Sequence, residues 1–585
     1  MYSKKKDREP VETISIIKNI LTNLGIELKE LWAPSSPYLY AVRLKYNNIV
    51  FSEGKGTSKE YALASAYGEL IERLQNGYIR SIMPTNFFAK LNATEIRLED
   101  FLKQDNIFAK ELIYQYLTPI HSKENETKKQ HLNSIDELFE TVLGEKVSSI
   151  NCVEFYSLKE KKNILLPYDI LSSLHSGNGM CAGNTMEEAL VQGFSEIIER
   201  YVGYSIITNK LVPPDVPASE YSCYPEILEM ISYYEKLGFT VHVKDCSLGK
   251  KLPAIGVFLI DKKAQKYASS IAANPLLPVA LERCFTELRQ ERDPSITGTD
   301  KLMLDFPFDK TKQKTLAQNI ELYAQKTVIQ FDINFFAAKP NWDYDATIWA
   351  NENNSNKELL KNIINVISQI SDNIYIRDVS FLGFPAYYIV IPDFSVLFTD
   401  KEYVRCRRLM RTIYDLLLSN DLSTENVSKI ISAINFNKEI NNWLSNPDLI
   451  KMFNDYYSLA ACYFHIGEYD KAYENISKYA ETLNLKEALA YTNCTKLLIN
   501  YKRGLITKEE YEKNLELFFE ENIISFINQT WVEISPLQHI IDCSITAKEY
   551  PLEDNSSQKD ILNRLQAHYK NNPPKQDALK ILEIA

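Results

Sequence analysis

The sequence predicts two units of different fold class, a mixed α/β domain over residues 1–415 and an all-α domain over residues 416–585. In the first unit, strand-like runs alternate with helical patterns, which indicates mixed α and β layers. In the second unit, the apolar pattern becomes continuously helical from about Leu422. The clearest strand-like runs are 39–44, 254–260, 267–274 and 386–391.

The composition favours a globular chain. With 585 residues the chain is too long for one hydrophobic core. Charged residues make up 24% and apolar residues 45%, which argues against disorder and against a membrane protein. The net charge of −11 argues against a dedicated nucleic-acid binder. We interpret the run Lys4–Lys6 as a solvated chain end, with a local basic patch as the alternative.

Two further features exclude particular classes. The basic start is followed by charged and proline residues where a signal peptide would be apolar, so we expect a cytoplasmic protein. The nine cysteines form no Cys-x-x-Cys pair, which suits neither a disulfide scaffold nor a structural zinc site. The histidines are isolated as well, and we expect His465 to be a packed or surface residue.

An internal repeat is the most informative feature. Residues 56–73 match residues 183–200 at a shift of 127, with Ala-Leu, an aromatic residue and Glu-x-Ile-Glu-Arg in the same register. A weaker third copy at 280–287 keeps Ala-Leu, the aromatic residue and the first glutamate, while Gln290 replaces the second. The repeat therefore predicts three related helices that present charged groups from an apolar surface.

Each of the first two copies begins as a glycine-containing loop that opens a helix. Ser58 and Thr185 stand at the N-cap positions, and Thr185 and Glu188 have the spacing of a capping box. The glutamates of each copy lie three residues apart, so they project from one side of the helix. They are Glu69 and Glu72 in the first copy and Glu196 and Glu199 in the second.

These two glutamate pairs predict a four-carboxylate site that shares one cation or contributes single ligands to neighbouring cations. The alternative is that they are ordinary surface residues paired with Arg73 and Arg200, an interpretation that two matching copies disfavour. Carboxylate oxygens suit Mg²⁺, which usually binds together with substrate phosphates. The site therefore implies a nucleotide.

The loops can supply the phosphate contacts. Residues 54–56 and 176–183 can bring backbone N–H groups and a helix N-terminus against phosphate. No Walker A motif occurs, which excludes a P-loop NTPase. The run Gly177-x-Gly179-x-x-Ala182 imitates a dinucleotide fingerprint, but a Rossmann interpretation leaves the glutamate helices unexplained.

These motifs together resemble the hallmark set of the YcaO family, in particular its stand-alone bacterial members. The resemblance implies a YcaO-type ATP-binding domain in which Mg²⁺ ions bridge the phosphates to Glu69, Glu72, Glu196 and Glu199. It assigns catalytic roles to Glu199, Arg200 and Arg283. The positions that it implies for ATP binding are Lys6, Thr13, Lys55, Ser65, Asn184, Glu188, Gln192, Arg200, Arg283 and Glu287. The chain departs from the family at Asn274, where relatives often have histidine.

The chemistry that the resemblance implies is activation of a peptide backbone amide. Phosphorylation turns the amide oxygen into a good leaving group, and the added nucleophile then decides between an azoline, a thioamide and other products. The chain lacks the Pro-x-Pro-x-Pro ending of azoline-forming relatives. This favours the stand-alone branch, which is associated with β-methylthiolation of a small-subunit ribosomal protein as an accessory factor. The implied partners are a radical-SAM methylthiotransferase, the ribosomal protein and a second copy of the chain.

Other function classes stay open. A nucleotide-binding accessory protein would keep the carboxylates without turnover of its own, and a pure scaffold would not need them. A carboxylate-pair hydrolase fits paired acids but not the accompanying arginines and glycine loops. Residues 459–473 resemble one tetratricopeptide (TPR) repeat, and a generic helical hairpin is the alternative. We expect the helical unit to offer a docking or dimerisation surface, and the charged segment 121–131 to be a mobile loop.

Overall fold

A computed structural model describes most of the chain. The described residues are 4–77, 93–103, 149–292, 328–396, 422–444, 455–533 and 555–574 apart from short internal gaps, with single positions such as Tyr323, Gln576 and Leu579. The expected loop 121–131 lies outside the described residues. Among the described helices, none has the length and apolar character that crossing a membrane requires.

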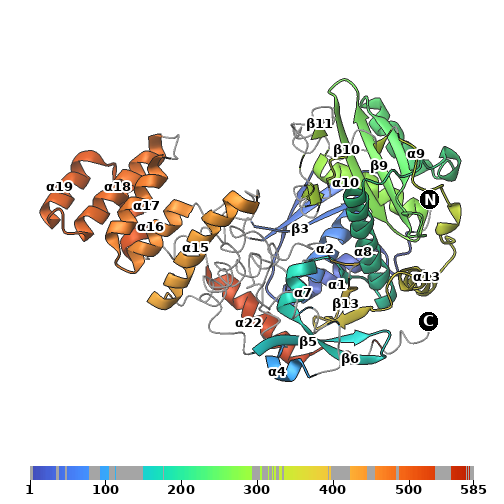
Figure 1. The fold of residues 1–585 in the computed structure, drawn as a ribbon, viewed down its shortest axis with the longest axis horizontal. Coiled ribbons are helices and arrows are strands. Elements are labelled where there is room, and N and C mark those ends of the chain that lie inside the picture. The colour runs from blue at the N-terminus through green and yellow to red at the C-terminus, as the bar shows by residue number, and fades with distance from the viewer. Residues whose placement is uncertain are drawn as a thin grey trace, which may run out of the picture.

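Three antiparallel sheets form the mixed α/β part of the chain (Figure 1). Their strand orders are β1-β2-β3, β11-β10-β9-β8, and β4-β5-β12-β13-β7 with β6 paired to β5. The strands are β1 (Lys29–Trp32), β2 (Tyr40–Tyr46), β3 (Ile49–Gly56), β4 (Thr94–Arg97), β5 (Ser149–Ser157), β6 (Lys162–Pro167), β7 (Met180–Ala182), β8 (Thr240–Asp245), β9 (Ala254–Asp261), β10 (Lys266–Ala273), β11 (Leu304–Asp305), β12 (Tyr375–Asp378) and β13 (Ala386–Val390). The strand-like runs of the sequence are confirmed as β2, β9, β10 and β13.

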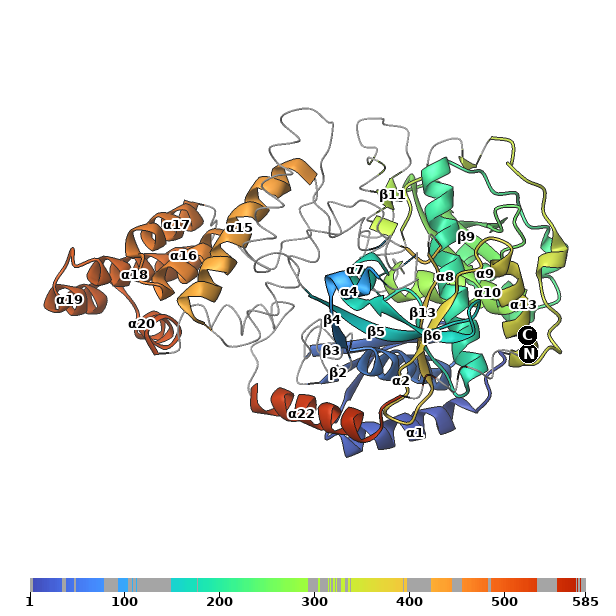
Figure 2. The same ribbon diagram turned by 60° about the horizontal axis from the view of Figure 1, so that its bottom comes forward.

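The three repeat copies form a strand followed by a helix each time. They are β3 with α2 (Lys59–Gln75), β7 with α8 (Met186–Asn209) and β10 with α10 (Leu277–Arg292). Each helix contacts two sheets, because α2 also meets β7 and β13, α8 also meets β10, and α10 also meets β2 and β3. The three helices therefore lie between the sheets (Figures 1 and 2).

The local sequence explains how these helices begin. The hydroxyl oxygen of Ser58 accepts a hydrogen bond from the Tyr61 N–H at 3.3 Å, and that of Thr185 accepts one from the Glu188 N–H at 3.2 Å. Each such cap contributes about 1 kcal/mol of stability. The two predicted N-caps are confirmed.

Glycines allow the strands to approach the helices that follow them. A Cβ atom added to Gly56 would lie 2.6 Å from the backbone nitrogen of Ala62, and one added to Gly183 would lie 2.6 Å from that of Ala189. Ala62 and Ala189 occupy equivalent positions of the repeat, so both copies use the same close contact. Only a residue without a side chain fits there.

The remaining helices of this part enclose the sheets and the repeat helices. Helix α1 packs on α2, α13 packs on α8, and α9 packs on β8 and α10. The apolar residues of α8 are the centre of a large core that includes side chains of α13, β10 and β13. These helices are α1 (Pro10–Asn23), α4 (Leu98–Phe101), α7 (Tyr168–His175), α9 (Pro225–Lys236) and α13 (Asn356–Ser368), with short 3-10 turns at Ala218–Glu220 and Ala346–Ile348.

The region after Thr424 is helical, as predicted, and has a core of its own. Buried apolar residues between Val427 and Trp531 form one cluster. The elements are α15 (Thr424–Leu444), α16 (Asp455–His465), α17 (Tyr469–Glu481), α18 (Lys486–Lys502), α19 (Lys508–Phe518), α20 (Glu521–Ile527), a π-helical turn (Asn528–Glu533) and α22 (Asn555–Asn571). Helices α16 and α17 pack together across a turn at Gly467, which has φ of +81°. The TPR-like character stays a prediction.

Helix α22 belongs to a different core from the helices before it. Its residues Ile561, Leu565 and Tyr569 pack with α1, α2 and β2, and Figure 2 shows α22 beside α1. The buried Gln576 side chain then bonds both the N–H and the carbonyl of Asp378 at the end of β12, at 2.8 and 2.9 Å. The proposed domain boundary at 415/416 lies outside the described residues, and the chain beyond it returns to the α/β part.

Candidate functional site

The glutamates of the first repeat helix are neutralised within their own helix. Arg73 Nη2 lies 3.4 Å from Glu69 Oε1, and Arg73 Nε lies 3.5 Å from Glu72 Oε1. The backbone N–H of Glu53 in β3 also donates to Glu69 Oε2 at 3.2 Å. The alternative in which these glutamates pair with their own arginine is therefore partly realised in α2.

The second repeat helix is connected to the third. Arg283 of α10 donates from Nη2 to Glu199 Oε2 at 3.2 Å and from Nη1 to Gln192 Oε1 at 2.7 Å. Both acceptors are on α8. Lys55 of β3 forms an ion pair with Glu287 of α10. The structure thus brings together predicted residues from all three copies.

Arg200 is held by a segment that the repeat does not include. Its Nη1 donates to the carbonyl oxygen of Tyr323 at 3.5 Å, and the Tyr323 hydroxyl donates to the backbone carbonyl of Glu199 at 2.7 Å. Burial lowers the pKa of Arg200, but the carboxylates of Glu196 and Glu199 outweigh it and raise that pKa. Arg200 therefore stays charged beside the glutamates.

The carboxylates of α2 and α8 influence one another. Burial, followed by repulsion from Glu196 and Glu69, raises the pKa of Glu72 well above its ordinary value, although Arg73 opposes this. Burial also raises the pKa of Glu199, again against the attraction of Arg283 and Arg200. Crowded and desolvated carboxylates of this kind would be stabilised by divalent cations.

The chemistry of these groups fits Mg²⁺ and phosphate. The buried Nε atoms of Arg200 and Arg283 make no hydrogen bond to the residues that the structure describes, so they are available to an anion. Within the same described ranges, no three acidic, histidine or cysteine side chains are placed to hold one metal ion. Both predicted arrangements, one shared cation and single ligands to neighbouring cations, stay predictions.

A second group of predicted residues gathers at the N-terminus of α8. The Thr13 hydroxyl donates to Asn184 Oδ1 at 2.8 Å, and Asn184 Nδ2 donates to Glu188 Oε2 at 3.1 Å. Lys6 Nζ lies 3.3 Å from Glu188 Oε1. The Glu188 carboxylate is therefore occupied by these groups, and only the Thr185 half of the predicted capping box is observed.

The other predicted positions form no hydrogen bond with these two groups of residues in the described part of the structure. Ser65 is exposed on α2. The Asn274 carboxamide oxygen accepts a hydrogen bond from the Leu276 N–H at 2.9 Å and so shapes the turn from β10 into α10. Ser176 of the second glycine loop lies outside the described residues.

The interpretation of Lys4 as part of a solvated end is wrong. Its side chain is 11% exposed, and Nζ lies 2.6 Å from Glu282 Oε1 of α10. Burial lowers the pKa of Lys4 against the attraction of Glu282. A run of three lysines gives no sign of this, because the acidic partner is distant in the sequence.

Three further residues at the site also escaped prediction. They are Asp7, Tyr323 and Asn356, which contact Thr185, Glu199 and Asp7 respectively. Each lies outside the repeated segments, so the shift that reveals the repeat cannot find them. For Asp7, the sequence offers only its place among the polar residues before the first helix as a sign.

Comparison with known proteins settles the family. The sequence model of the ATP- and Mg²⁺-binding YcaO cyclodehydratase family matches residues 53–395, more than half of the chain. The chain belongs to the YcaO family. The resemblance noted from the repeat is thereby confirmed, and ATP and Mg²⁺ are the ligands of this family.

Two curated relatives have similar sequences. The ribosomal protein S12 methylthiotransferase accessory factor YcaO of Escherichia coli is 29% identical over 413 residues, covering 68% of this YcaO chain and 67% of the relative. An uncharacterized protein of Haemophilus influenzae is 29% identical over 409 residues, with 68% and 67% covered.

Two solved structures also match this chain, both at less than 20% sequence identity. A heterocyclase in complex with substrate and cofactor has 18% identity and a TM-score of 0.47, and the match covers 67% of this chain and 53% of the heterocyclase. YcaO from Methanopyrus kandleri bound with AMPPCP and Mg²⁺ has 14% identity and a TM-score of 0.42, covering 66% of this chain and 92% of the other.

Proposed function

We propose that this YcaO protein uses ATP and Mg²⁺ to activate a backbone amide of a peptide or protein substrate. The observation that carries the proposal is Arg283 of the third repeat helix bonded to both Glu199 and Gln192 of the second. Such a cation between an acid and an amide is placed to contact phosphate while staying oriented by its neighbours. The family match to residues 53–395 supports it.

The residues of the chain have distinct parts in this proposal. ATP, when bound with Mg²⁺, supplies the phosphoryl group that makes an amide oxygen a leaving group. Arg200 and Arg283 orient the phosphates and balance their charge. The four glutamates hold the cations. The proposed contacts to the rest of the nucleotide come from Lys6, Thr13, Lys55, Ser65, Asn184, Glu188, Gln192 and Glu287.

The name of the Escherichia coli relative suggests a more specific setting. We propose that the chain acts in the cytoplasm as a homodimer and as an accessory factor in β-methylthiolation of a small-subunit ribosomal protein, beside a radical-SAM methylthiotransferase. Formation of an azoline or a thioamide is the alternative outcome of the same activation.

A second candidate is a nucleotide-binding accessory protein without turnover of its own. The separate core between Val427 and Trp531 favours it, because a distinct helical unit is suited to docking a protein partner. Phosphate release from ATP, measured with and without ribosomal protein and methylthiotransferase, separates the two candidates. Release that depends on substrate supports the enzyme, and binding without any release supports the accessory role.

Calorimetry of Mg·ATP binding tests the nucleotide site itself. Glu199→Gln removes the charge that Arg283 faces, and we expect binding to weaken on the order of 100-fold. Glu229→Gln, an exposed glutamate of α9, is the matched control and should bind as the wild type does. Absence of wild-type binding at millimolar ATP would remove the foundation of the proposal.

A further inference from the structure

The segment before α1 crosses the ends of the repeat helices. Lys4 Nζ donates to both Glu282 carboxylate oxygens, at 2.6 and 2.7 Å, and to the Thr57 hydroxyl. Two residues later, Lys6 pairs with Glu188 of α8. We call residues 4–7 the strap. It joins the third repeat helix to the second and carries one of the proposed nucleotide contacts.

The strap is turned by an unusual backbone conformation. Lys5 has φ of +52°, in the left-handed region that residues with a side chain adopt rarely. Such a conformation persists where surrounding contacts fix it. Here the lysines on either side of Lys5 reach different helices, α10 and α8.

Asn356, the first residue of α13, supplies the contacts that hold this turn. Its Nδ2 donates to the carbonyl oxygen of Lys5 and to Asp7 Oδ1, each at 2.9 Å. A carboxamide nitrogen has two hydrogens, and both are used. Asn356 is 8% exposed, and it holds the Lys5 backbone on one side of Lys6 and the Asp7 side chain on the other.

Asp7 connects the same contacts to the N-terminus of α8. Its backbone N–H donates to Glu188 Oε2 at 2.9 Å, and Asp7 Oδ2 accepts from the Thr185 hydroxyl that caps the helix. A carboxylate is favoured at this end of a helix. Asn356, Asp7 and Lys6 thus form one connected network on Glu188.

We propose that Asn356 is a positioning residue for nucleotide binding, and that it acts by holding Lys6 at Glu188. The inference rests on the proposed function, in which Lys6 and Glu188 contact ATP. It assigns a part in the site to α13, an element outside the three repeat copies. The predicted consequence is that loss of the Asn356 side chain weakens ATP binding only while Lys6 is present.

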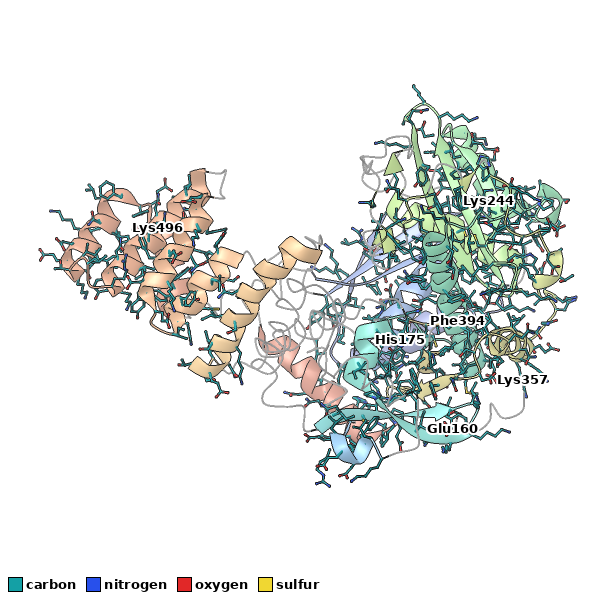
Figure 3. All side chains as sticks on the ribbon, in the orientation of Figure 1. Glu160, His175, Lys244, Lys357, Phe394 and Lys496 are labelled. Atoms are coloured by element: carbon teal, nitrogen blue, oxygen red, sulfur yellow. The ribbon has the colours of Figure 1, made fainter. Side chains whose placement is uncertain are left out.

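The variants follow from the two hydrogen bonds. Asn356→Ala removes both donors, and Asn356→Asp also sets a carboxylate against Asp7. The double variant Asp7→Asn with Asn356→Asp reverses donor and acceptor and restores one of the bonds. The matched control is Lys357→Ala, because Lys357 is the next residue of α13 and is exposed (Figure 3).

A double-mutant cycle on Mg·ATP affinity tests the proposal. With both donors lost, we expect Asn356→Ala to weaken ATP binding about tenfold and Asn356→Asp to weaken it further. The reversed pair should recover part of the loss, and Lys357→Ala should leave binding unchanged. In a Lys6→Ala background, Asn356→Ala should add less than about twofold, because the residue through which it acts is gone.

The outcomes separate this inference from the function on which it rests. If the wild type binds no ATP, the proposed function fails and the inference falls with it. If the wild type binds ATP but Asn356→Ala is neutral, tightens binding, or adds its full effect to Lys6→Ala, the inference alone is overturned. Thermal unfolding without nucleotide is measured beside each variant, and a variant that does not fold is replaced in the comparison by the reversed pair.

Discussion

The first two repeat helices carry the same Glu-x-Ile-Glu-Arg motif but neutralise it differently. In α2 the Glu72 side chain, the equivalent of Glu199, is 15% exposed and pairs with Arg73 of the same helix, which is itself 27% exposed. In α8 the Glu199 side chain is 5% exposed and pairs with Arg283 of α10. Arg200, the equivalent of Arg73, contacts the carbonyl of Tyr323 instead. The glutamate–arginine pair thus lies within one helix in the first copy and joins two helices in the second.

This difference indicates where the binding energy of the site is concentrated. A pair within one helix whose arginine is 27% exposed depends less on its partner, because water reaches the arginine when the pair separates. A buried pair between helices is sensitive to loss of either partner, because the remaining charge stays desolvated. We therefore expect α8 and α10 to dominate the site and α2 to complete it.

The largest expected effect comes from breaking the inter-helix pair. Arg283→Met leaves Glu199 buried without its partner, and we expect a loss of roughly 3–4 kcal/mol of stability together with loss of ATP binding. Arg73→Met, the matched change in α2, should cost less stability than Arg283→Met, because Arg73 is 27% exposed and its partners lie on its own helix. Urea unfolding and calorimetry give both quantities. Equal costs for the two arginines would show that the helices do not differ as described.

A buried histidine just before the second repeat copy allows a test of burial by pH. His175 of α7 is fully buried, and its Nδ1 lies 3.0 Å from the Ser395 carbonyl, which can only accept, so Nδ1 carries the hydrogen. Burial lowers the pKa of His175 to about 4, against the opposing hydrogen bond.

This lowered pKa makes the folded state lose stability as the pH falls. Below the ordinary histidine pKa of about 6.5 the unfolded chain binds a proton that the folded chain excludes, so stability is full above that pH and decreases toward pH 4. The loss by that pH is roughly 3 kcal/mol. His175→Gln should flatten this part of the unfolding free energy measured against pH. An unchanged slope would contradict the burial of His175.

The repeat explains why much of the site could be predicted and part of it could not. Glu199, Gln192 and Arg283 occupy corresponding faces of related helices, so sequence periodicity alone brings them toward one site. Asn356 and Tyr323 contact the site through loops and a helix of unrelated sequence, and their partners lie more than 100 residues away in the chain. Pairing at that separation depends on how the sheets pack, which no local pattern encodes.

The fold shows the same division. Strand and helix positions follow from alternating and helical patterns, and the caps at Ser58 and Thr185 follow from residue type. The return of α22 to the α/β part could not be predicted, because its apolar residues have the same helical spacing as those of its neighbours. Which core a helix joins is decided by the length of chain before it and by the surface it meets.

Two glycines sharpen the comparison of the repeat copies. Gly56→Ala and Gly183→Ala would each place a Cβ atom 2.6 Å from a helix backbone nitrogen, which cannot yield without moving the helix. We expect each to cost roughly 2 kcal/mol. Thermal unfolding of the two variants should therefore give matching shifts. A much smaller shift for Gly56 would mean that the first copy is more loosely packed than the second.

The smallest expected effect is a gain in stability at Gly68. Its counterpart in the second copy, Ser195, is fully buried and donates to the Val191 carbonyl at 2.7 Å. A Cβ atom added to Gly68 meets no atom of the described residues within 4 Å. Gly68→Ala should therefore stabilise α2 by about 0.5–1 kcal/mol, because alanine loses less backbone freedom on folding. A raised midpoint of thermal unfolding with unchanged ATP affinity would confirm that this face of α2 is open, and a lowered midpoint would show that it packs against another part of the chain.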